Sequence, residues 1–312
     1  MQEDRWERDA LREVALEGIR ERRRTRRWGI LFKSLFLAYL VVVLALVMGW
    51  VPGTTETTPG DHAAVVEVDG AIMPGGVNDS EKVNRALRRA FEAPEARGVV
   101  LKVNSPGGSP VQASRINQEI RRLKEEHPDT PLHVVAGDMF TSGAYYLAVS
   151  ADSIFVDQAT MVGSIGVMMN GFGFHEAMER LGIERRLHTA GDNKAFMDPF
   201  SEEDPEDVER LRQLLDDIHQ QFIAAVREGR GDRLADNDEI FSGEVWTGAR
   251  SIELGLADEI GGMQHVVRDV IGVESVRDYT ERPNLLERLG RGMGTAVGES
   301  FAQHVLGPSH LE

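Results

Sequence analysis

GVVLKVNSPGGSP, residues 98–110, is the stretch of sequence that decides the fold class. Its first part, Gly98–Val103, is a short apolar run rich in valine, which predicts a buried strand. Pro106 cannot continue that strand, and Gly107 and Gly108 allow a turn that other residues resist. The pattern of Val111–Glu126 then predicts a helix. A strand, a glycine turn and a helix in this order are typical of an α/β fold.

The same unit recurs along the chain. Further strands are predicted at Ala63–Val68, Pro131–Ala136, Ser153–Val156 and Arg186–Thr189, and further helices at Ser80–Ala93, directly after FTSG (Phe140–Gly143) and at Asp204–Glu228. Alternating strands and helices predict a mainly parallel sheet with helices packed on its faces. Ligand-binding groups in such a fold gather in the loops after the strand ends, where NSPGG and FTSG both lie.

Composition excludes several classes of function. The 312 residues contain no cysteine, so disulfides, zinc–thiolate sites and cysteine nucleophiles are excluded. The net charge is −16, although residues 1–33 carry 10 Lys and Arg against 7 Asp and Glu. The body is therefore acidic, which argues against a nucleic acid partner.

The N-terminal region predicts a membrane anchor. Ser34–Val51 holds no charged residue, and with the apolar residues just upstream it approaches the ~20 residues that cross a bilayer. Basic residues crowd the preceding segment, whereas residues 52–71 contain no Lys or Arg, so we expect the N-terminus in the cytoplasm. A cleaved signal peptide and a buried core helix are the alternatives. We expect a basic cytoplasmic segment at 1–28, a transmembrane signal anchor at 29–51 and a linker at 52–62.

Two glycine-flanked serines and one loop carry possible chemistry. The Gly107–Gly108 turn could aim N–H groups at an oxyanion, or be a plain strand-to-helix turn. Ser142 could be a nucleophile with the Gly143 N–H as its oxyanion donor, or simply cap a helix. Ser164, in GSIGV, could hold a neutral amine or belong to a tight turn.

A nucleophilic serine needs a base, and no histidine has a suitable partner. The candidates His133, His175, His188 and His219 are scattered and are each predicted to be structural or surface residues. Lys194 lies in an apolar neighbourhood that could lower its pKa enough for a general base. The alternative is a surface lysine beside Asp192.

Taken together, the motifs resemble the signal peptide peptidase A family of membrane-bound serine proteases. The resemblance covers about Ala63–Val270 and rests on VNSPGG (103–108), TSGAYYLAVSAD (141–152), VGSIGV (162–167), HTAGDNK (188–194) and SGEVWTGARSIELGLADEIGG (242–262). It implies a Clp-protease/crotonase-like fold with a repeated ββα-type core, a homo-oligomeric ring and no cofactor or metal. It also implies hydrolysis of cleaved signal peptides and other hydrophobic peptides at the extracytoplasmic face of the bacterial inner membrane.

The resemblance assigns roles residue by residue. It makes Ser142 the nucleophile of a Ser–Lys dyad, Lys194 the general base and Ser164 the residue that orients the lysine amine. The oxyanion N–H groups would come from Gly107, Gly108 and Gly143, and neighbouring protomers could complete each site.

The remaining expectations concern boundaries, one departure and two rival functions. The protease domain is expected at 63–274 and a tail of unassigned role at 275–312. The family often has two small residues before its serine, where this chain has Phe140 and Thr141, so the bulkier Phe140 could reshape a substrate pocket. A non-catalytic membrane scaffold or peptide-binding ring, and a crotonase-like acyl-CoA enzyme, are the alternative functions.

Overall fold

A computed structural model describes residues 26–45 and 60–282. The rest of the predicted N-terminal segment (1–25), the end of the anchor with most of the linker (46–59) and most of the predicted tail (283–312) lie outside the described residues. Gly60–Arg282 forms one compact unit. This unit begins near the expected start of the protease domain and extends past the expected end at residue 274.

The helix Arg26–Ala45 is long and apolar enough to cross a membrane, with a mean hydropathy of 2.1 over its most apolar window. It is the one such helix in the described parts of the chain. Its length and composition agree with the predicted anchor, but a signal sequence meets the same criteria. The helix therefore suggests membrane association without choosing between an anchor and a cleaved leader.

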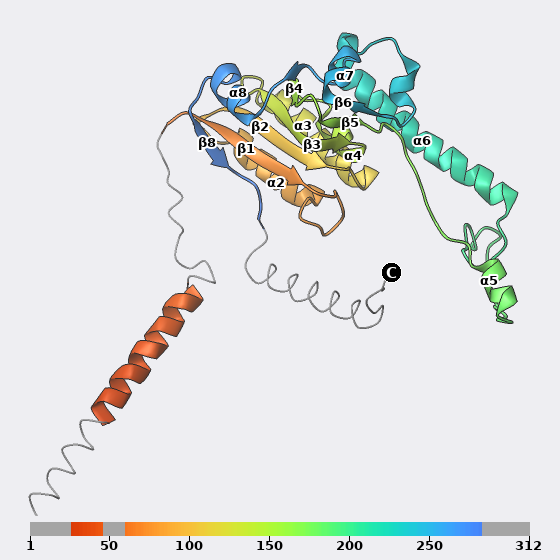
Figure 1. Cartoon of the computed structure of the whole chain (residues 1–312), viewed down its shortest axis with the longest axis horizontal. Helices are drawn as coiled ribbons and strands as arrows, with labels where there is room; N and C mark the ends of the chain where they lie inside the picture. Colours follow the sequence, from red (N-terminus) through yellow and green to blue (C-terminus); the bar gives the residue numbers. More distant parts are fainter. Residues whose placement is uncertain (1–25, 46–59, 283–312) are drawn as a thin grey trace, which may run out of the picture. The chain divides into compact units, whose positions relative to one another are not determined.

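The compact unit is built on an eight-stranded sheet in the order β6-β5-β3-β2-β1-β8, with β4 paired to β3 and β7 paired to β4 (Figure 1). The strands are β1 (His62–Asp69), β2 (Ala96–Ser105), β3 (Leu132–Thr141), β4 (Ser153–Val156), β5 (Met161–Gly163), β6 (Val245–Thr247), β7 (Glu259–Ile260) and β8 (Ser275–Asp278). Every pair is parallel except β5 with β6. The predicted α/β fold with a mainly parallel sheet is confirmed.

Helices connect the strands. They are α2 (Ser80–Phe91), α3 (Pro110–Glu126), α4 (Gly143–Ala148), α5 (His175–Arg180), α6 (Pro205–Arg230), α7 (Gly248–Glu253) and α8 (Met263–His265), with short 3-10 helices η1 (Gly231–Arg233) and η2 (Asp238–Phe241) and a π-helix η3 (Val266–Val270). The long predicted helices and the first three predicted strands are present within a few residues of their expected bounds. The predicted tail begins with β8, which pairs in parallel with β1.

The strand predicted at Arg186–Thr189 is wrong, because these residues form neither strand nor helix. They are exposed and lie between α5 and α6, where no neighbouring strand offers backbone hydrogen bonds. An apolar residue between basic ones is not sufficient for a strand without a sheet to join.

The sheet is buried on both faces. Side chains such as Val66, Leu101 and Val134 pack into the larger core with α2, α3 and α4. Their neighbours in the strands, Val65 and Val100 among them, face a smaller core with η3. Because successive side chains of a strand point to opposite faces, these near-continuous apolar strands are typical of a parallel sheet.

Residues 167–218, here called the arm, contribute no buried side chain to either core. The arm contains α5, the segment after it and the first half of α6, and Figure 1 shows α5 at the end of α6 that points away from the sheet. Its parts hold one another: Phe174 stacks on Phe200 with ring centroids 5.5 Å apart, and Arg185 pairs with Asp198. The buried residues of α6 begin only at Phe222.

A buried ion pair fixes the C-terminal end of α6. The Arg230 side chain is fully buried, and its Nη1 and Nη2 atoms donate to the two carboxylate oxygens of Asp258 at 2.9 and 2.8 Å. Asp258 also accepts from the N–H of Ile154 in β4 at 2.7 Å. Burial raises the pKa of Asp258, but the hydrogen bonds and charge of Arg230 outweigh it, so the net pKa is below its usual value.

We predict that Arg230→Met lowers the free energy of unfolding by about 3–5 kcal/mol, because it removes the buried, two-point partner of the half-buried Asp258 carboxylate. Arg233→Met, which removes a more exposed guanidinium from the same carboxylate, is the matched control and costs about 1 kcal/mol or less. Urea unfolding measures both. Equal losses in the two variants would contradict a dominant role for the buried pair.

The lowered pKa of Asp258 also makes its contribution to stability depend on pH. Its contribution to stability is complete above the unfolded pKa of about 3.9 and is lost as the pH falls through the folded value. Arg230→Met should therefore lose less stability than the native chain as the pH falls below about 4, as measured by urea unfolding.

Candidate active site

The NSPGG loop packs directly against the start of α4. Gly107 has φ +97°, and a Cβ atom on it would lie 2.7 Å from the Gly143 nitrogen and 2.8 Å from Ser142 Cβ. Gly108 has φ +150°, and its Cβ would lie 2.2 Å from the carbonyl oxygen of Ile72. Only glycine fits at either position, both for its conformation and for space. The predicted loop and the predicted serine are thus in contact.

Two backbone N–H groups beside the serine have no acceptor among the described residues. Ile72 donates to the Gly107 oxygen at 2.9 Å and accepts from Ser109 at 2.8 Å, which forms a parallel bridge with Gly108. In such a bridge the N–H of the middle residue points away from its partner, and a Cβ on Gly143 would lie 3.2 Å from the Gly108 nitrogen. Gly143 is the first residue of α4, so its N–H has no acceptor within the helix.

The third predicted oxyanion donor is already used. The N–H of Gly107 donates to Ser105 Oγ at 3.1 Å, which stabilises the turn. Among the described residues, Gly108 and Gly143 are therefore the two predicted donors whose N–H groups have no acceptor.

Ser142 has a strained backbone and a free hydroxyl. Its φ of +53° and ψ of −127° are unusual for a residue with a side chain. It occupies the N-cap position of α4, but its side chain makes no capping hydrogen bond. Such strain costs about 1–3 kcal/mol and persists where the surroundings hold the residue in place. The hydroxyl is thus not spent on the helix.

Ser164 lies beside Ser142 and has the same unusual backbone. Thr141 of β3 pairs with Gly163 of β5, and the Ser142 N–H donates to the Gly163 oxygen at 2.8 Å. Ser164 has φ +52° and donates its own N–H to the Glu244 carbonyl at 2.7 Å. Its side chain makes no hydrogen bond within the described residues, so this hydroxyl is also available.

Lys194 is not brought to these serines within one chain. It is exposed on the arm, and the neighbouring Asn193 accepts from Arg210 Nη1 at 2.6 Å. Arg210 precedes His219 by nine residues, or roughly 14 Å along α6, and it is His219 that bonds the carbonyl of Ile165 beside Ser164 at 3.0 Å. The apolar burial expected around the Lys194 amine is likewise not supplied by one chain.

Two features at the site were not anticipated from the sequence. Ile72, in an irregular stretch between β1 and α2, holds the Gly108 turn in place, and no sequence pattern marks it. The adjacent Met73 and the nearby Val111 at the start of α3 are exposed apolar residues at the same edge. They can offer apolar contact to a substrate bound beside Ser142. Residues 26–45 and 60–282 contain no cluster of three or more side chains that could hold a metal ion.

The expectation that Phe140 reshapes a substrate pocket is wrong. Phe140 is 0% exposed, lies in the larger core and packs edge-on against Tyr145 with ring centroids 5.2 Å apart. Side chains alternate along β3, so the residue two positions before Ser142 points into the core.

Comparison with known protein families gives independent information on these residues. Residues 124–274 match the model of peptidase family S49, and they include Ser142, Ser164 and Lys194 but not the NSPGG loop. These residues, just under half of the chain, are similar to peptidase family S49. The resemblance to the signal peptide peptidase A family is thereby confirmed.

Two relatives of the chain carry different names. A putative signal peptide peptidase SppA from Enterococcus faecium is 29% identical over 62% of this chain and 56% of its own length. A Brucella abortus protein named Na(+)/H(+) antiporter NhaA is 42% identical over 67% of this chain, but the match covers only 29% of that protein. The chain thus spans less than two thirds of either relative, and the antiporter name is not carried over to it.

A solved structure of a point mutant of the 1510-N membrane-bound stomatin-specific protease also matches the chain. The match covers 72% of this chain and 99% of the solved one, at 14% identity and a TM-score of 0.40. Because this TM-score is below 0.5, the fold is assigned from the observed strand order alone.

We predict that Gly107→Ala slows acylation of Ser142 by a serine-reactive probe at least about 100-fold, the cost of losing one oxyanion donor. The added methyl group must displace the Gly143 nitrogen or Ser142 itself. Gly262→Ala is the control, because its Cβ meets nothing within 4 Å and its φ is −108°. Native labelling rates in a folded Gly107→Ala chain would contradict the assignment.

We also predict that Phe140→Ala lowers the free energy of unfolding by about 3–5 kcal/mol, as expected for a buried aromatic side chain. The residues preferred at the cleavage site should not change, as judged by mass spectrometry of peptide products. Val276→Ala, at a 51% exposed residue outside the arm, should change stability by about 0.5 kcal/mol or less. An altered cleavage preference in Phe140→Ala would restore the pocket hypothesis.

Proposed function

We propose that this protein is a membrane-associated serine endopeptidase in which Ser142 is the nucleophile and Lys194 the general base. One observation carries the proposal. The Ser142 hydroxyl makes no capping hydrogen bond, and it lies beside the N–H groups of Gly108 and Gly143, which have no acceptor among the described residues. A nucleophile next to two convergent donors is the arrangement that acyl transfer requires. The S49 match supports the same reaction class.

The reaction begins when the Ser142 hydroxyl attacks the carbonyl carbon of a peptide bond. The proton of the hydroxyl passes to the neutral amine of Lys194, and the negative charge on the carbonyl oxygen is held by Gly108 and Gly143. The protonated lysine then gives its proton to the leaving amine as the C–N bond breaks. Water attacks the acyl-enzyme, with Lys194 again accepting a proton, and releases the second product.

Lys194 is supplied by a neighbouring copy of the chain. Within one chain it is exposed on the arm and its segment is fastened to α6 well away from Ser142. The arm also exposes large apolar side chains, including Met168, Phe172 and Leu181, which are 74–81% exposed. An exposed apolar extension of this kind is typical of a surface that is covered by a partner. A homo-oligomeric ring would cover it and complete each site.

Ser164 positions the lysine amine. Its free hydroxyl lies one residue beyond the Gly163 carbonyl that binds Ser142, so an amine placed at Ser142 would also be within reach of Ser164. A hydrogen bond from an N–H of the amine to Ser164 Oγ would hold the amine with its lone pair toward the Ser142 hydroxyl and so fix the direction of the proton transfer.

The substrates are cleaved signal peptides and other hydrophobic peptides near the membrane. The apolar helix Arg26–Ala45 would hold the catalytic unit on the extracytoplasmic face of the bacterial inner membrane, with the basic N-terminus in the cytoplasm. Met73 and Val111 at the site edge suit apolar peptide side chains.

A non-catalytic scaffold is the alternative that the separation of Lys194 from Ser142 favours. A scaffold needs neither residue, so it would show no covalent labelling of Ser142 and no loss of function in Lys194→Ala. A crotonase-like acyl-CoA enzyme has no such support and would have to bind a CoA ester.

The decisive experiment mixes two inactive chains. We predict that Ser142→Ala and Lys194→Ala each abolish peptide hydrolysis alone, but that equal amounts reassembled together recover up to roughly a quarter of native activity. In a ring with sites between neighbours, about one interface in four would pair an intact serine with an intact lysine. Lys102→Ala, on the face of β2 away from the site, is the control for loss of a lysine.

Two outcomes would contradict the proposal in different ways. Full activity of Lys194→Ala alone would exclude the dyad. Inactive single variants that never complement would place both groups in one chain and exclude the shared site.

A further inference from the structure

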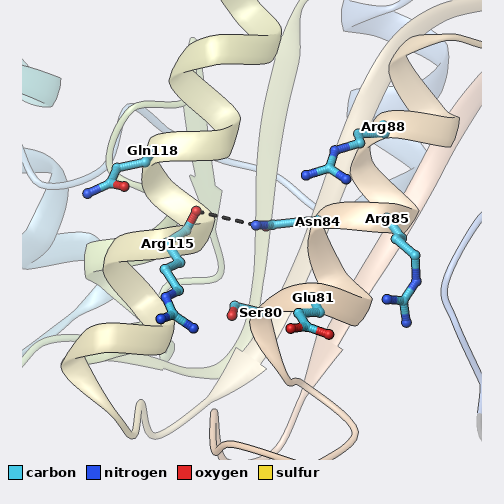
Figure 2. A pocket seen from close by; sticks show the side chains of 7 residues that line it. All are labelled: Ser80, Glu81, Asn84, Arg85, Arg88, Arg115 and Gln118. Atoms are coloured by element: carbon cyan, nitrogen blue, oxygen red, sulfur yellow. Dashed lines mark hydrogen bonds between the residues drawn. The ribbon is translucent and has the colours of Figure 1, made fainter.

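A groove between α2 and α3 is not part of the site described above. It has a volume of about 360 Å³ and is lined by Ser80, Glu81, Asn84 and Gln118 and by three arginines, Arg85, Arg88 and Arg115 (Figure 2). Its lining is polar throughout, in a chain whose net charge is −16. The concentration of guanidinium groups therefore indicates an acidic partner. We call it the arginine groove.

The arginines have donors to spare. Arg115 makes no side-chain hydrogen bond or ion pair within the described residues. Arg88 uses its Nε atom for Glu119 at 2.5 Å, which leaves both of its Nη groups. Arg85 binds Glu281 through Nε and Nη2 and keeps Nη1. A guanidinium presents five N–H donors, so Arg88 and Arg115, which extend into the space between α2 and α3 in Figure 2, can bind a further carboxylate.

Asn84 shows that the ligand must also donate. Its Nδ2 atom donates to the Arg115 carbonyl at 3.4 Å, the dashed line in Figure 2. Its Oδ1 atom is buried and has no partner, and an unsatisfied buried acceptor costs about 1–3 kcal/mol. A lone carboxylate group would satisfy the arginines but, having no donor, would leave Oδ1 unpaired. An acidic peptide segment offers carboxylates for the arginines and N–H groups for Asn84.

The chain itself contains such a segment. Residues 201–207 read SEEDPED, at the start of α6 on the arm. Glu202, Glu203 and Asp204 are exposed, and none of them forms an ion pair within the described residues. We propose that the arginine groove binds residues 202–204 of a second copy of this chain.

The placement of both features supports this docking. The groove runs along α2 from Ser80 to Arg88 and beside Arg115 and Gln118 of α3. These two helices follow the carboxyl ends of β1 and β2, and Ser142 follows the end of β3 at the same edge of the sheet. On the arm, Arg210 bonds both Asn193 and Glu206, so Lys194 lies close to the acidic segment. One arm thus presents a lysine and an acidic segment, and one body presents a serine and the groove.

This docking rests on the proposed function, because the contact would direct the arm that carries Lys194 toward Ser142 of a neighbouring chain. The electrostatic contact would set the register of the arm on the neighbour, whereas the apolar side chains of the arm would supply most of the buried area.

Disulfide trapping tests the docking in the full chain, which has no cysteine of its own. One preparation carries Gln118→Cys and a second, differently tagged preparation carries Glu202→Cys. After reassembly and mild oxidation we expect a disulfide-linked dimer that contains both tags. Gln213→Cys, exposed on α6, replaces Glu202→Cys in the matched control and should give at least about tenfold less dimer, since a disulfide requires Cα atoms within about 7 Å.

Three outcomes would overturn the docking. One is an equal yield with Gln213→Cys. Another is the absence of the mixed dimer. The third is an intramolecular disulfide in a chain carrying both Gln118→Cys and Glu202→Cys, which would mean that the arm folds onto its own body.

A charge exchange tests the same contact by activity. We expect Arg115→Glu and Glu203→Arg each to lower kcat/KM for peptide hydrolysis by at least about fivefold, and the two together to restore it to within about twofold of the native chain. Arg268→Glu, an exposed arginine on η3 over the other face of the sheet, should have no effect. Losses that add in the double variant would overturn the proposed pair.

The docking and the dyad can fail separately. A trapped mixed dimer together with full activity of Lys194→Ala would keep the docking and exclude the dyad. Complementation between Ser142→Ala and Lys194→Ala without trapping or charge rescue would keep the dyad and exclude the docking.

Discussion

The close approach of two glycines to Ser142 is the constraint on which the site depends. At Gly107 and Gly108 there is no room for a side chain, since even a Cβ atom would overlap the backbone of Gly143 or of Ile72. This contact joins the loop after β2 to the loop after β3 and leaves two N–H groups unpaired beside one hydroxyl. A parallel sheet makes the arrangement possible, because it brings the ends of consecutive strands to one edge.

The parts of the structure that follow from local pattern were predictable from the sequence. Valine-rich runs bounded by turns indicated the strands of the central sheet, and the 3–4 spacing of apolar residues indicated its covering helices. Gly107, Gly108, Ser142, Gly143 and Ser164 were identified as candidates, and the structure places them together. What local pattern could not show was which N–H groups are already bonded, as at Gly107, and that Phe140 faces the core.

Two other features depend on contacts between residues far apart in the chain, so local sequence patterns did not predict them. β5 to β8 are only two to four residues long, and each exists because a longer strand or neighbour accepts its hydrogen bonds. Arg186–Thr189 has a comparable length but no such neighbour, and it forms no strand. Lys194 was identified by type and motif, yet its distance from Ser142 is set by α6, whose direction is fixed far away by Arg230 and Asp258.

The arm also has a consequence for control of the enzyme. Under the proposed mechanism, a chain that keeps its base on the arm, beyond reach of its own serine, would be latent as a single copy. Hydrolysis would start only when chains accumulate in the membrane and meet, which makes local chain density the activating signal. In the proposed enzyme, the geometry of the arm would thus protect the membrane's own proteins until copies of the chain meet.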